Sequence, residues 1–151
     1  MTIDLKDLLI EKPVTLCYWK LAENWQVLKD YFERETEFKL ISTPEEISSW
    51  ITATDVHNII IGLEDPKTIK EISPHIEAIP LEKRRKIFLL LVSIGVTTLD
   101  PKEAFLYSVN LVLNPADVKE LERIYLKCKR YWESLYRGFN GVYQKVMEVI
   151  L

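Results

Sequence analysis

Two acidic residues, Glu64 and Asp65, stand where an α/β protein commonly carries its chemistry. They follow an apolar run, residues 59–61, that ends at Gly62, and Pro66 comes directly after them. A carboxylate at the carboxyl end of a strand could serve as a nucleophile or a metal ligand. Asp before Pro is equally typical of a helix N-cap, and Glu beside it favours the positive end of the helix dipole. We expect the cap.

The other residues capable of chemistry form no recognisable set. His57 and His75 lack metal-ligand spacing, and Cys17 and Cys128 make neither a metal motif nor a disulfide framework. The four glycines are scattered, and no glycine-rich phosphate loop follows the first apolar run. We therefore expect no metal, no cofactor and no catalytic nucleophile with its base, and we predict that the protein is not an enzyme.

Length and composition are typical of one globular domain. The chain has 151 residues, 48% hydrophobic and 28% charged, with a formal net charge of -3. This charge disfavours nucleic-acid binding and binding to anionic membranes, and the basic cluster at residues 82–86 is expected to be a solvated turn. No apolar run has the length of a membrane span. We expect a cytoplasmic protein, and the many Lys and Glu residues suggest a thermophilic source.

Short apolar runs alternate with amphipathic stretches along the chain. A lead-in segment, residues 1–13, includes a possible short helix over residues 4–12. Strands are expected at residues 14–19, 38–42, 57–63, 86–93 and 110–115. Helices are expected at residues 23–35, 43–51, 66–80 with a break at Pro74, 100–109, and from residue 116 onward.

Local signals support the expected helix starts. Asn24 is a plausible cap for the first helix. Thr43 is expected as the N-cap of the second, with Pro44 in its first turn and Glu46 completing a capping box.

Five strand-helix pairs in strict alternation predict an α/β fold of three layers, αβα, with a five-stranded parallel sheet between helices. Right-handed crossovers give the strand order 2-1-3-4-5, the flavodoxin-like arrangement. Its binding crevice lies at the carboxyl ends of strands one and three, which are residues 18–20 and 62–65.

The fifth unit, AFLYSVNLVLNPADVKELERI at residues 104–124, resembles that of a response-regulator receiver domain. Receivers have there a short helix, a strand ending in Lys-Pro, and a helix that opens with an acid and Glu-Leu. This sequence has Asn114-Pro115, then Asp117 and Glu120-Leu121. The order and lengths of the elements are similar over residues 14–128, so the resemblance implies a receiver-like domain there and an extension over residues 129–151.

The resemblance also implies where phosphorylation chemistry would lie. Receivers accept a phosphoryl group on an aspartate ending strand three, with Mg²⁺ held by further carboxylates, a Ser or Thr ending strand four and a Lys ending strand five. Only Ser93 fits that pattern. The corresponding pocket, which we call the vestigial acceptor pocket, would be lined by Tyr18, Trp19, Lys20, Gly62, Ser93 and Asn114. We predict a pseudo-receiver, degenerate at the phosphorylation site.

The last helix carries an apolar heptad pattern of more than four repeats. Its apolar positions are Val118, Leu121, Tyr125, Cys128, Trp132, Leu135, Phe139, Val142, Val146 and Val149. Steps of three and four alternate, a 3.5-residue period typical of a coiled coil. The part from about Trp132 is expected to project beyond the domain, and such a seam must be buried.

Two arrangements would bury this seam. A second copy could supply the same helix, or the chain could bend at residues 138–141 and fold back on its own domain. We prefer the homodimer. Its predicted interface comprises Tyr125, Cys128, Trp132, Leu135, Phe139, Val142, Val146 and Val149.

The sequence thus favours a protein-protein interaction and dimerisation module, with an unknown signalling protein as its partner. The alternative is a small-molecule or nucleotide binder that uses the crevice, where Tyr18 and Trp19 could stack on a ring.

Overall fold

The chain folds around a five-stranded parallel sheet, in a computed structural model that describes residues 12–150 and the side chains of residues 12–135. The strands are β1 (Val14–Trp19), β2 (Glu37–Ile41), β3 (Val56–Gly62), β4 (Phe88–Val92) and β5 (Leu111–Leu113). The α-helices are α1 (Gln26–Phe32), α2 (Glu46–Ala53), α3 (Ser73–Glu77), α4 (Leu81–Arg84), α5 (Pro101–Tyr107) and α6 (Leu121–Ile150). Two 3₁₀ segments, η2 (Pro66–Glu71) and η3 (Pro115–Glu120), precede α3 and α6.

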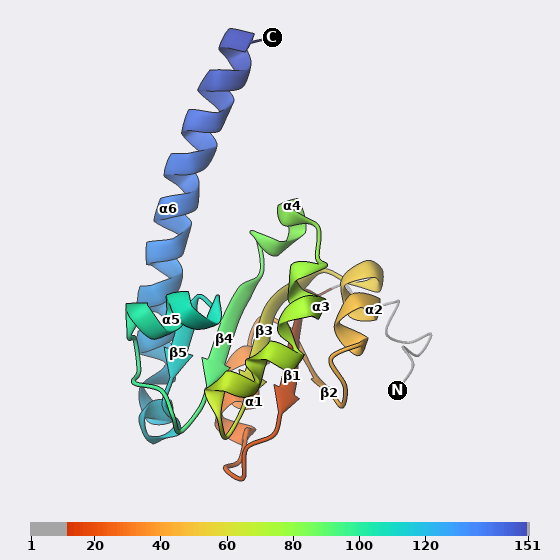
Figure 1. Cartoon of the computed structure of the whole chain (residues 1–151), viewed down its shortest axis with the longest axis vertical. Helices are drawn as coiled ribbons and strands as arrows, with labels where there is room; N and C mark the ends of the chain where they lie inside the picture. Colours follow the sequence, from red (N-terminus) through yellow and green to blue (C-terminus); the bar gives the residue numbers. More distant parts are fainter. Residues whose placement is uncertain (1–11, 151) are drawn as a thin grey trace.

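The predicted strand order is confirmed. The sheet runs β2-β1-β3-β4-β5, and all four neighbouring pairs are parallel. Helices cover both faces, which gives the flavodoxin-like αβα arrangement (Figure 1). Trp19 pairs with Gly62, and Gly62 pairs with Val92, so β1, β3 and β4 end together at one edge.

The apolar run of β3 is continuous because both faces of the sheet are covered. Ile59 and Ile61 belong to the core under α2 and α3, whereas Ile60 belongs to the core under α1 and α6. All three side chains are fully buried. A strand covered on one face only would alternate apolar and polar residues.

Most of the helix-start signals are confirmed. The Asp100 carboxylate accepts hydrogen bonds from the backbone N–H groups of Lys102 and Glu103, and Pro101 opens α5. The predicted break at Pro74 is also present, since η2 ends at Glu71 and α3 begins at Ser73. The cap predicted at Asn24 is displaced by one residue: Trp25 holds the cap position of α1, and Asn24 accepts from the N–H of Gln26, the first residue of the helix.

The N-cap predicted at Thr43 is wrong. The helix α2 begins at Glu46, with Glu45 at the cap position. The Glu46 carboxylate still accepts from the N–H groups of Ser42 and Thr43, at 2.6 and 2.9 Å. This contact is the backward half of the predicted capping box, and it orders the turn that comes before the helix.

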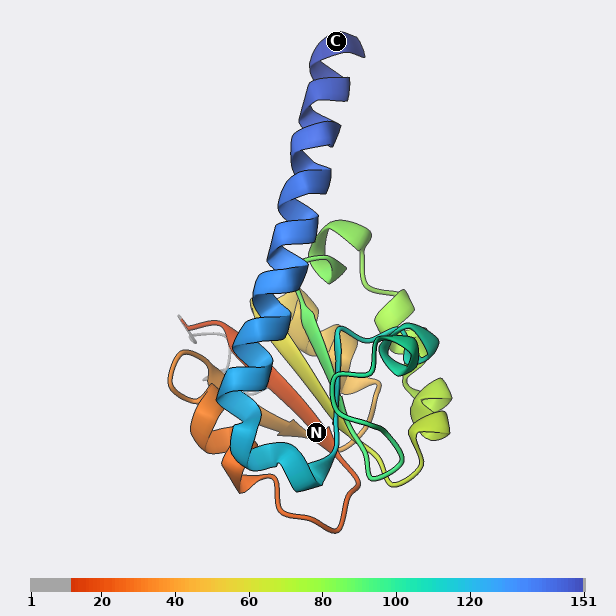
Figure 2. The same cartoon turned by 90° about the vertical axis from the view of Figure 1, so that its left-hand side faces the viewer.

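The last helix, α6, is continuous from Leu121 to Ile150, without a bend at residues 138–141. Its 30 residues correspond to about 45 Å. Figures 1 and 2 show that its first part lies across one face of the sheet and that the rest extends past the end at which β4 begins. The predicted lead-in helix at residues 4–12 lies almost wholly outside the described residues.

Candidate functional site

The residues of the predicted acceptor pocket do come to one edge of the sheet. Trp19 and Gly62 end paired strands, and the N–H of Lys20 donates to the Gly62 carbonyl at 2.8 Å. Ser93 follows the last residue of β4, and Asn114 follows the last residue of β5. Because parallel strands end in register, their carboxyl ends supply residues distant in sequence to a single crevice.

The space beside Gly62 is filled by Trp19. A Cβ atom built on Gly62 would lie 2.3 Å from Cε3 of Trp19 and 2.7 Å from both Cδ2 and Cζ3. The indole is held in place, because its Nε1 donates to the Glu23 carbonyl at 2.7 Å. No side chain larger than hydrogen fits at position 62 unless Trp19 moves.

Ser93 is fully buried and engaged with backbone. Its hydroxyl donates to the Glu64 carbonyl at 3.1 Å and accepts from the Gly95 N–H at 3.2 Å. The hydroxyl thereby joins the turn after β4 to the turn after β3. This role needs a small donor and acceptor at that position and requires no ligand.

The Asn114 side chain also makes backbone contacts. Its Oδ1 accepts from the Ala116 N–H at 3.0 Å and caps η3, while its Nδ2 donates to the Val96 carbonyl at 2.9 Å. It therefore holds the loop after β4 against the start of η3. A longer Lys side chain could not cap η3 in this way, since it has no acceptor.

Glu64 and Asp65 have separate structural partners. Asp65 accepts from the Lys67 N–H at 3.0 Å, as predicted for an N-cap before Pro66. The Glu64 carboxylate accepts from the Ala22 N–H at 3.2 Å, a link to the loop after β1 that sequence reasoning missed. The contact joins residues 42 positions apart, so no local pattern could have revealed it.

Tyr18 and Lys20 associate with each other. Tyr18 lies in the core under α2 and α3, and the Nζ of Lys20 lies 5.2 Å from the centre of its ring. Burial raises the pKa of the Tyr18 hydroxyl, with smaller contributions from Glu71 and Glu45. The Tyr18 ring is thus part of the core, with little face left for stacking on a ligand.

The predicted seam of α6 is divided between the domain and the extension. Tyr125 and Cys128 are buried beneath the helix in their own domain, and Trp132 is half-buried there. Cys128 Sγ and Trp132 Nε1 both donate to the Asn110 carbonyl, at 3.2 and 3.0 Å. Leu135 remains 47% exposed, so the unburied part of the described seam begins there.

A buried polar chain fixes α6 on the sheet, and no sequence signal indicated it. The Tyr125 hydroxyl donates to Asn58 Oδ1 at 2.8 Å, and Asn58 Nδ2 donates to the Thr15 hydroxyl at 3.1 Å. The Thr15 and Thr36 hydroxyls are 2.8 Å apart. Because Thr36 donates to the Phe32 carbonyl, Thr15 must donate to Thr36, and each group is satisfied.

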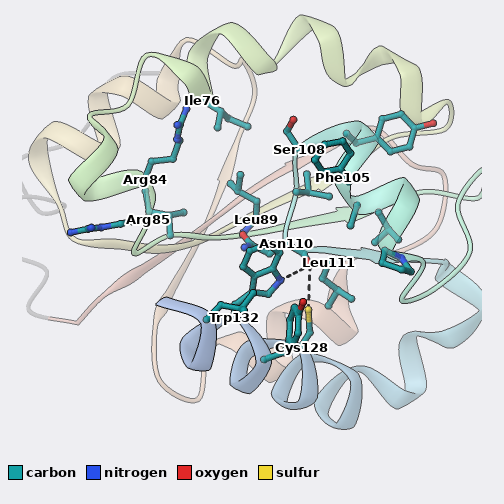
Figure 3. A pocket seen from close by; sticks show the side chains of 18 of the residues that line it. Ile76, Arg84, Arg85, Leu89, Phe105, Ser108, Asn110, Leu111, Cys128 and Trp132 are labelled. Carbon is teal, nitrogen blue, oxygen red and sulfur yellow. Dashed lines mark hydrogen bonds between the residues drawn. The ribbon is translucent and has the colours of Figure 1, made fainter. Parts of the chain in front are cut away.

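A large groove lies at the opposite edge of the sheet from the acceptor pocket. Its volume is about 1750 Å³, and α3, α4, α5, α6 and the first residues of β4 and β5 line it. Figure 3 shows Arg84 and Arg85 at one end, Phe105 and Ser108 at the other, and Trp132 and Cys128 on the α6 side. Phe105 is 88% exposed and Tyr131 60%, so apolar surface is open to solvent here.

Two further features concern the part of the chain that the structure describes. Within it, no three His, Cys, Asp or Glu side chains are grouped so that they could hold a metal ion. None of the helices in that part combines the length and the apolar character needed to cross a membrane.

Comparison with solved structures supports the fold. The chain is similar to a CheY-like protein, tadZ, of Pseudomonas aeruginosa PAO1, with 11% identity and a TM-score of 0.57 over 77% of this chain and 98% of that one. It is also similar to the receiver domain of the Francisella response regulator 1452, with 16% identity and a TM-score of 0.50 over 79% and 98%.

A third similar structure carries the yeast Spc42 trimeric coiled coil fused to another structure, with 9% identity, a TM-score of 0.51 and full coverage of both chains. No protein-family profile matches the chain, and no curated protein does. At these identities the likeness concerns the fold alone. The chain has a CheY-like, flavodoxin-like fold.

Proposed function

We propose that this chain is a pseudo-receiver, a receiver-like domain that takes no phosphoryl group and acts as a protein-protein interaction and dimerisation module in signalling. The observation that carries this proposal is the packing at Gly62. The resemblance places the acceptor aspartate at this position, where even a Cβ atom would lie 2.3 Å from the Trp19 indole.

The surroundings of Gly62 support the same proposal. Phosphoryl transfer to a carboxylate needs Mg²⁺, which prefers oxygen ligands. The resemblance places the metal-binding acids after β1, where this chain has the aromatic Trp19 and the cation Lys20. A lysine ammonium repels a divalent cation, and the hydroxyl of Ser93 and amide of Asn114 already bond to the backbone.

The phosphorylation proposal is tested with acetyl phosphate. The protein is incubated with acetyl phosphate and Mg²⁺ next to a phosphorylatable receiver domain, and the intact masses are measured. We expect an adduct of one phosphoryl group on the control receiver and none on this protein. A stable adduct on this protein would refute the pseudo-receiver.

The dimerisation proposal rests on α6. The helix continues past Leu135 for another fifteen residues, about 22 Å, and the sequence keeps Phe139, Val142, Val146 and Val149 in heptad phase through it. The continuity of the helix favours an intermolecular burial of this seam over the alternative in which the chain bends and folds back.

Light scattering tests the dimer. We expect twice the chain mass for the unmodified protein and the mass of a single chain for Phe139→Glu. Gln144→Glu is the matched control, since it adds a carboxylate to the same stretch at an outer heptad position and should leave the dimer intact. A monomeric mass for the unmodified chain would contradict dimerisation.

The alternative function, a nucleotide or small-molecule binder at the acceptor-pocket crevice, has weaker support because Trp19 fills that space and Tyr18 is buried. A reproducible thermal shift with nucleotides or flavins would promote it.

A further inference from the structure

The direction in which two copies pair follows from how α6 packs on its own domain. The apolar heptad stripe of α6 has two parts, one that packs on its own domain and one that continues beyond it. Its first part, with Tyr125 and Cys128, faces the sheet, and the next apolar positions, Trp132 and Leu135, line the groove above the starts of β4 and β5. A partner helix that packs on the continuation of this stripe therefore lies directly above the edge of the sheet.

A parallel partner would collide with the domain. In a parallel pair the partner helix runs alongside residues 121–132 as well, and that side of α6 is already occupied by β4 and β5. In an antiparallel pair the part of the partner helix that approaches the sheet is residues 146–150, and the partner's domain lies at the far end. Figures 1 and 2 show that α6 extends freely beyond the sheet and leaves room there.

We propose that two copies pair antiparallel through the extension of α6, and that the groove of each copy receives residues 146–150 of the partner's α6. This inference rests on the proposed dimerisation and adds its direction, its register and the occupant of the groove. It commits the groove to a second copy of this chain.

Side-chain size supports the antiparallel register. When heptad a positions of one helix pack against d positions of the other, Trp132 pairs with the partner's Val149, Leu135 with Val146, and Phe139 with Val142. Each aromatic residue then meets a valine. A parallel pairing would set Trp132 against Trp132 and Phe139 against Phe139, with large residues facing large ones. Alternation of large and small residues gives the better packing.

The groove lies at the level of α6 to which the register brings the partner's residues 146–150. These residues pair with residues 131–135, of which Tyr131, Trp132 and Leu135 line the groove. Five residues span about 7.5 Å of helix. Arg84 and Arg85 add positive charge at one end of the groove.

The surface area that a stable dimer must bury indicates that the groove belongs to the dimer interface. A stable dimer buries about 1,200–2,000 Å² in total. The stretch that the register pairs, residues 132–149, is about two and a half heptads, shorter than the three to four heptads expected of an independent coiled coil. With about 200 Å² for each aromatic side chain, Phe105 and Tyr131 together expose about 300 Å² per copy. Burying part of this surface would bring the interface into the range of a stable dimer.

Disulfide cross-linking tests the direction. Leu135→Cys and Val146→Cys chains carrying tags of different size are expressed separately and together, then oxidised briefly. We expect cross-links in the mixture, between one chain of each kind, and none in either variant alone. The unmodified chain is the control, because Cys17 and Cys128 are buried.

The outcomes separate this inference from the dimer itself. Cross-links in Leu135→Cys alone would mean a parallel pair and would overturn the inference while leaving dimerisation standing. A dimeric mass with no cross-link in any sample would overturn the register, and a trimeric mass would overturn the two-fold arrangement. A monomeric mass would remove the proposed dimerisation first.

A second measurement tests the groove. Leu81→Asp places a charge on a groove residue that is 65% exposed, and Ile94→Asp does the same on a residue that is 53% exposed after β4, at the opposite edge of the sheet. We expect Leu81→Asp to weaken the dimer by about tenfold or more, from the loss of one buried leucine, and Ile94→Asp to leave it unchanged. Equal dissociation constants for the two variants would overturn the groove contact.

Discussion

Adding one methyl group at Gly62 should destabilise the protein through a single neighbour, Trp19. Gly62 lies within β3 and its carbonyl accepts from Lys20, so the backbone has little freedom to withdraw. Its φ is not positive, and alanine is therefore acceptable to the backbone. The whole penalty should come from the contact of 2.3 Å between the new Cβ and Cε3 of Trp19.

The expected cost of Gly62→Ala is about 2 kcal/mol in the free energy of unfolding, the middle of the range for overpacking a filled site. Relief of the contact requires the indole to rotate away and to lose its hydrogen bond to the Glu23 carbonyl. In a Trp19→Ala background there is no ring to displace. The same substitution should then be neutral or stabilising by about 0.5 kcal/mol, because alanine has fewer unfolded conformations than glycine.

The four proteins of this cycle are compared by guanidinium unfolding, followed by far-UV circular dichroism because Trp19 itself contributes to fluorescence. We expect a coupling free energy of about 2 kcal/mol between positions 19 and 62. If Gly62→Ala costs the same in both backgrounds, the packing argument for the blocked acceptor position is wrong.

Three further predictions concern stability. Tyr125→Phe should lower the free energy of unfolding by about 1–3 kcal/mol, because it leaves the buried Asn58 carbonyl oxygen without its donor. Tyr31→Phe removes a hydroxyl that belongs neither to this polar chain nor to the groove; it is the control and should lower the free energy less by urea unfolding. Asp65→Ala should cost about 1 kcal/mol, whereas Asp65→Asn keeps an acceptor for the Lys67 N–H and should cost less; equal losses would exclude the capping role. Burial raises the pKa of the Cys17 thiol to about 12. Between pH 9 and 12 the unfolded chain therefore loses the thiol proton while the folded chain keeps it, and the free energy of unfolding should fall as the pH rises. Over that window the free energy of unfolding of Cys17→Ala should fall by up to about 1.4 kcal/mol less per pH unit than that of the unmodified protein. Parallel curves of stability against pH for the two proteins would contradict the raised pKa of Cys17.

The strand order could be predicted from the sequence because each strand carries its own signal. The five apolar runs are short, continuous and separated by capped amphipathic stretches, and handedness rules then leave few topologies. Asp65, Asp100 and Asn114 act as caps within two or three residues of themselves. The start of α2 was misplaced because Glu46 orders the turn before the helix rather than its first turn.

Only part of the candidate site could be predicted from the sequence. Tyr18, Trp19, Lys20, Gly62, Ser93 and Asn114 could be placed at one edge, since parallel strands end together. What each side chain does there depends on partners far along the chain. Glu64 bonds to Ala22, and Ser93 bonds to Glu64. Trp19 fills the space at Gly62 because β1 and β3 pair side by side, which no local sequence pattern indicates.

The alternation of elements, the parallel sheet, the caps and the long heptad pattern can be predicted from the sequence, because all of these arise from local periodicity and backbone chemistry. How far that heptad pattern is used inside the domain depends on tertiary packing. Tyr125 and Cys128 are buried on the sheet, whereas Leu135 is not. A heptad repeat indicates that one side of a helix is buried, whereas the rest of the fold determines which neighbours bury it.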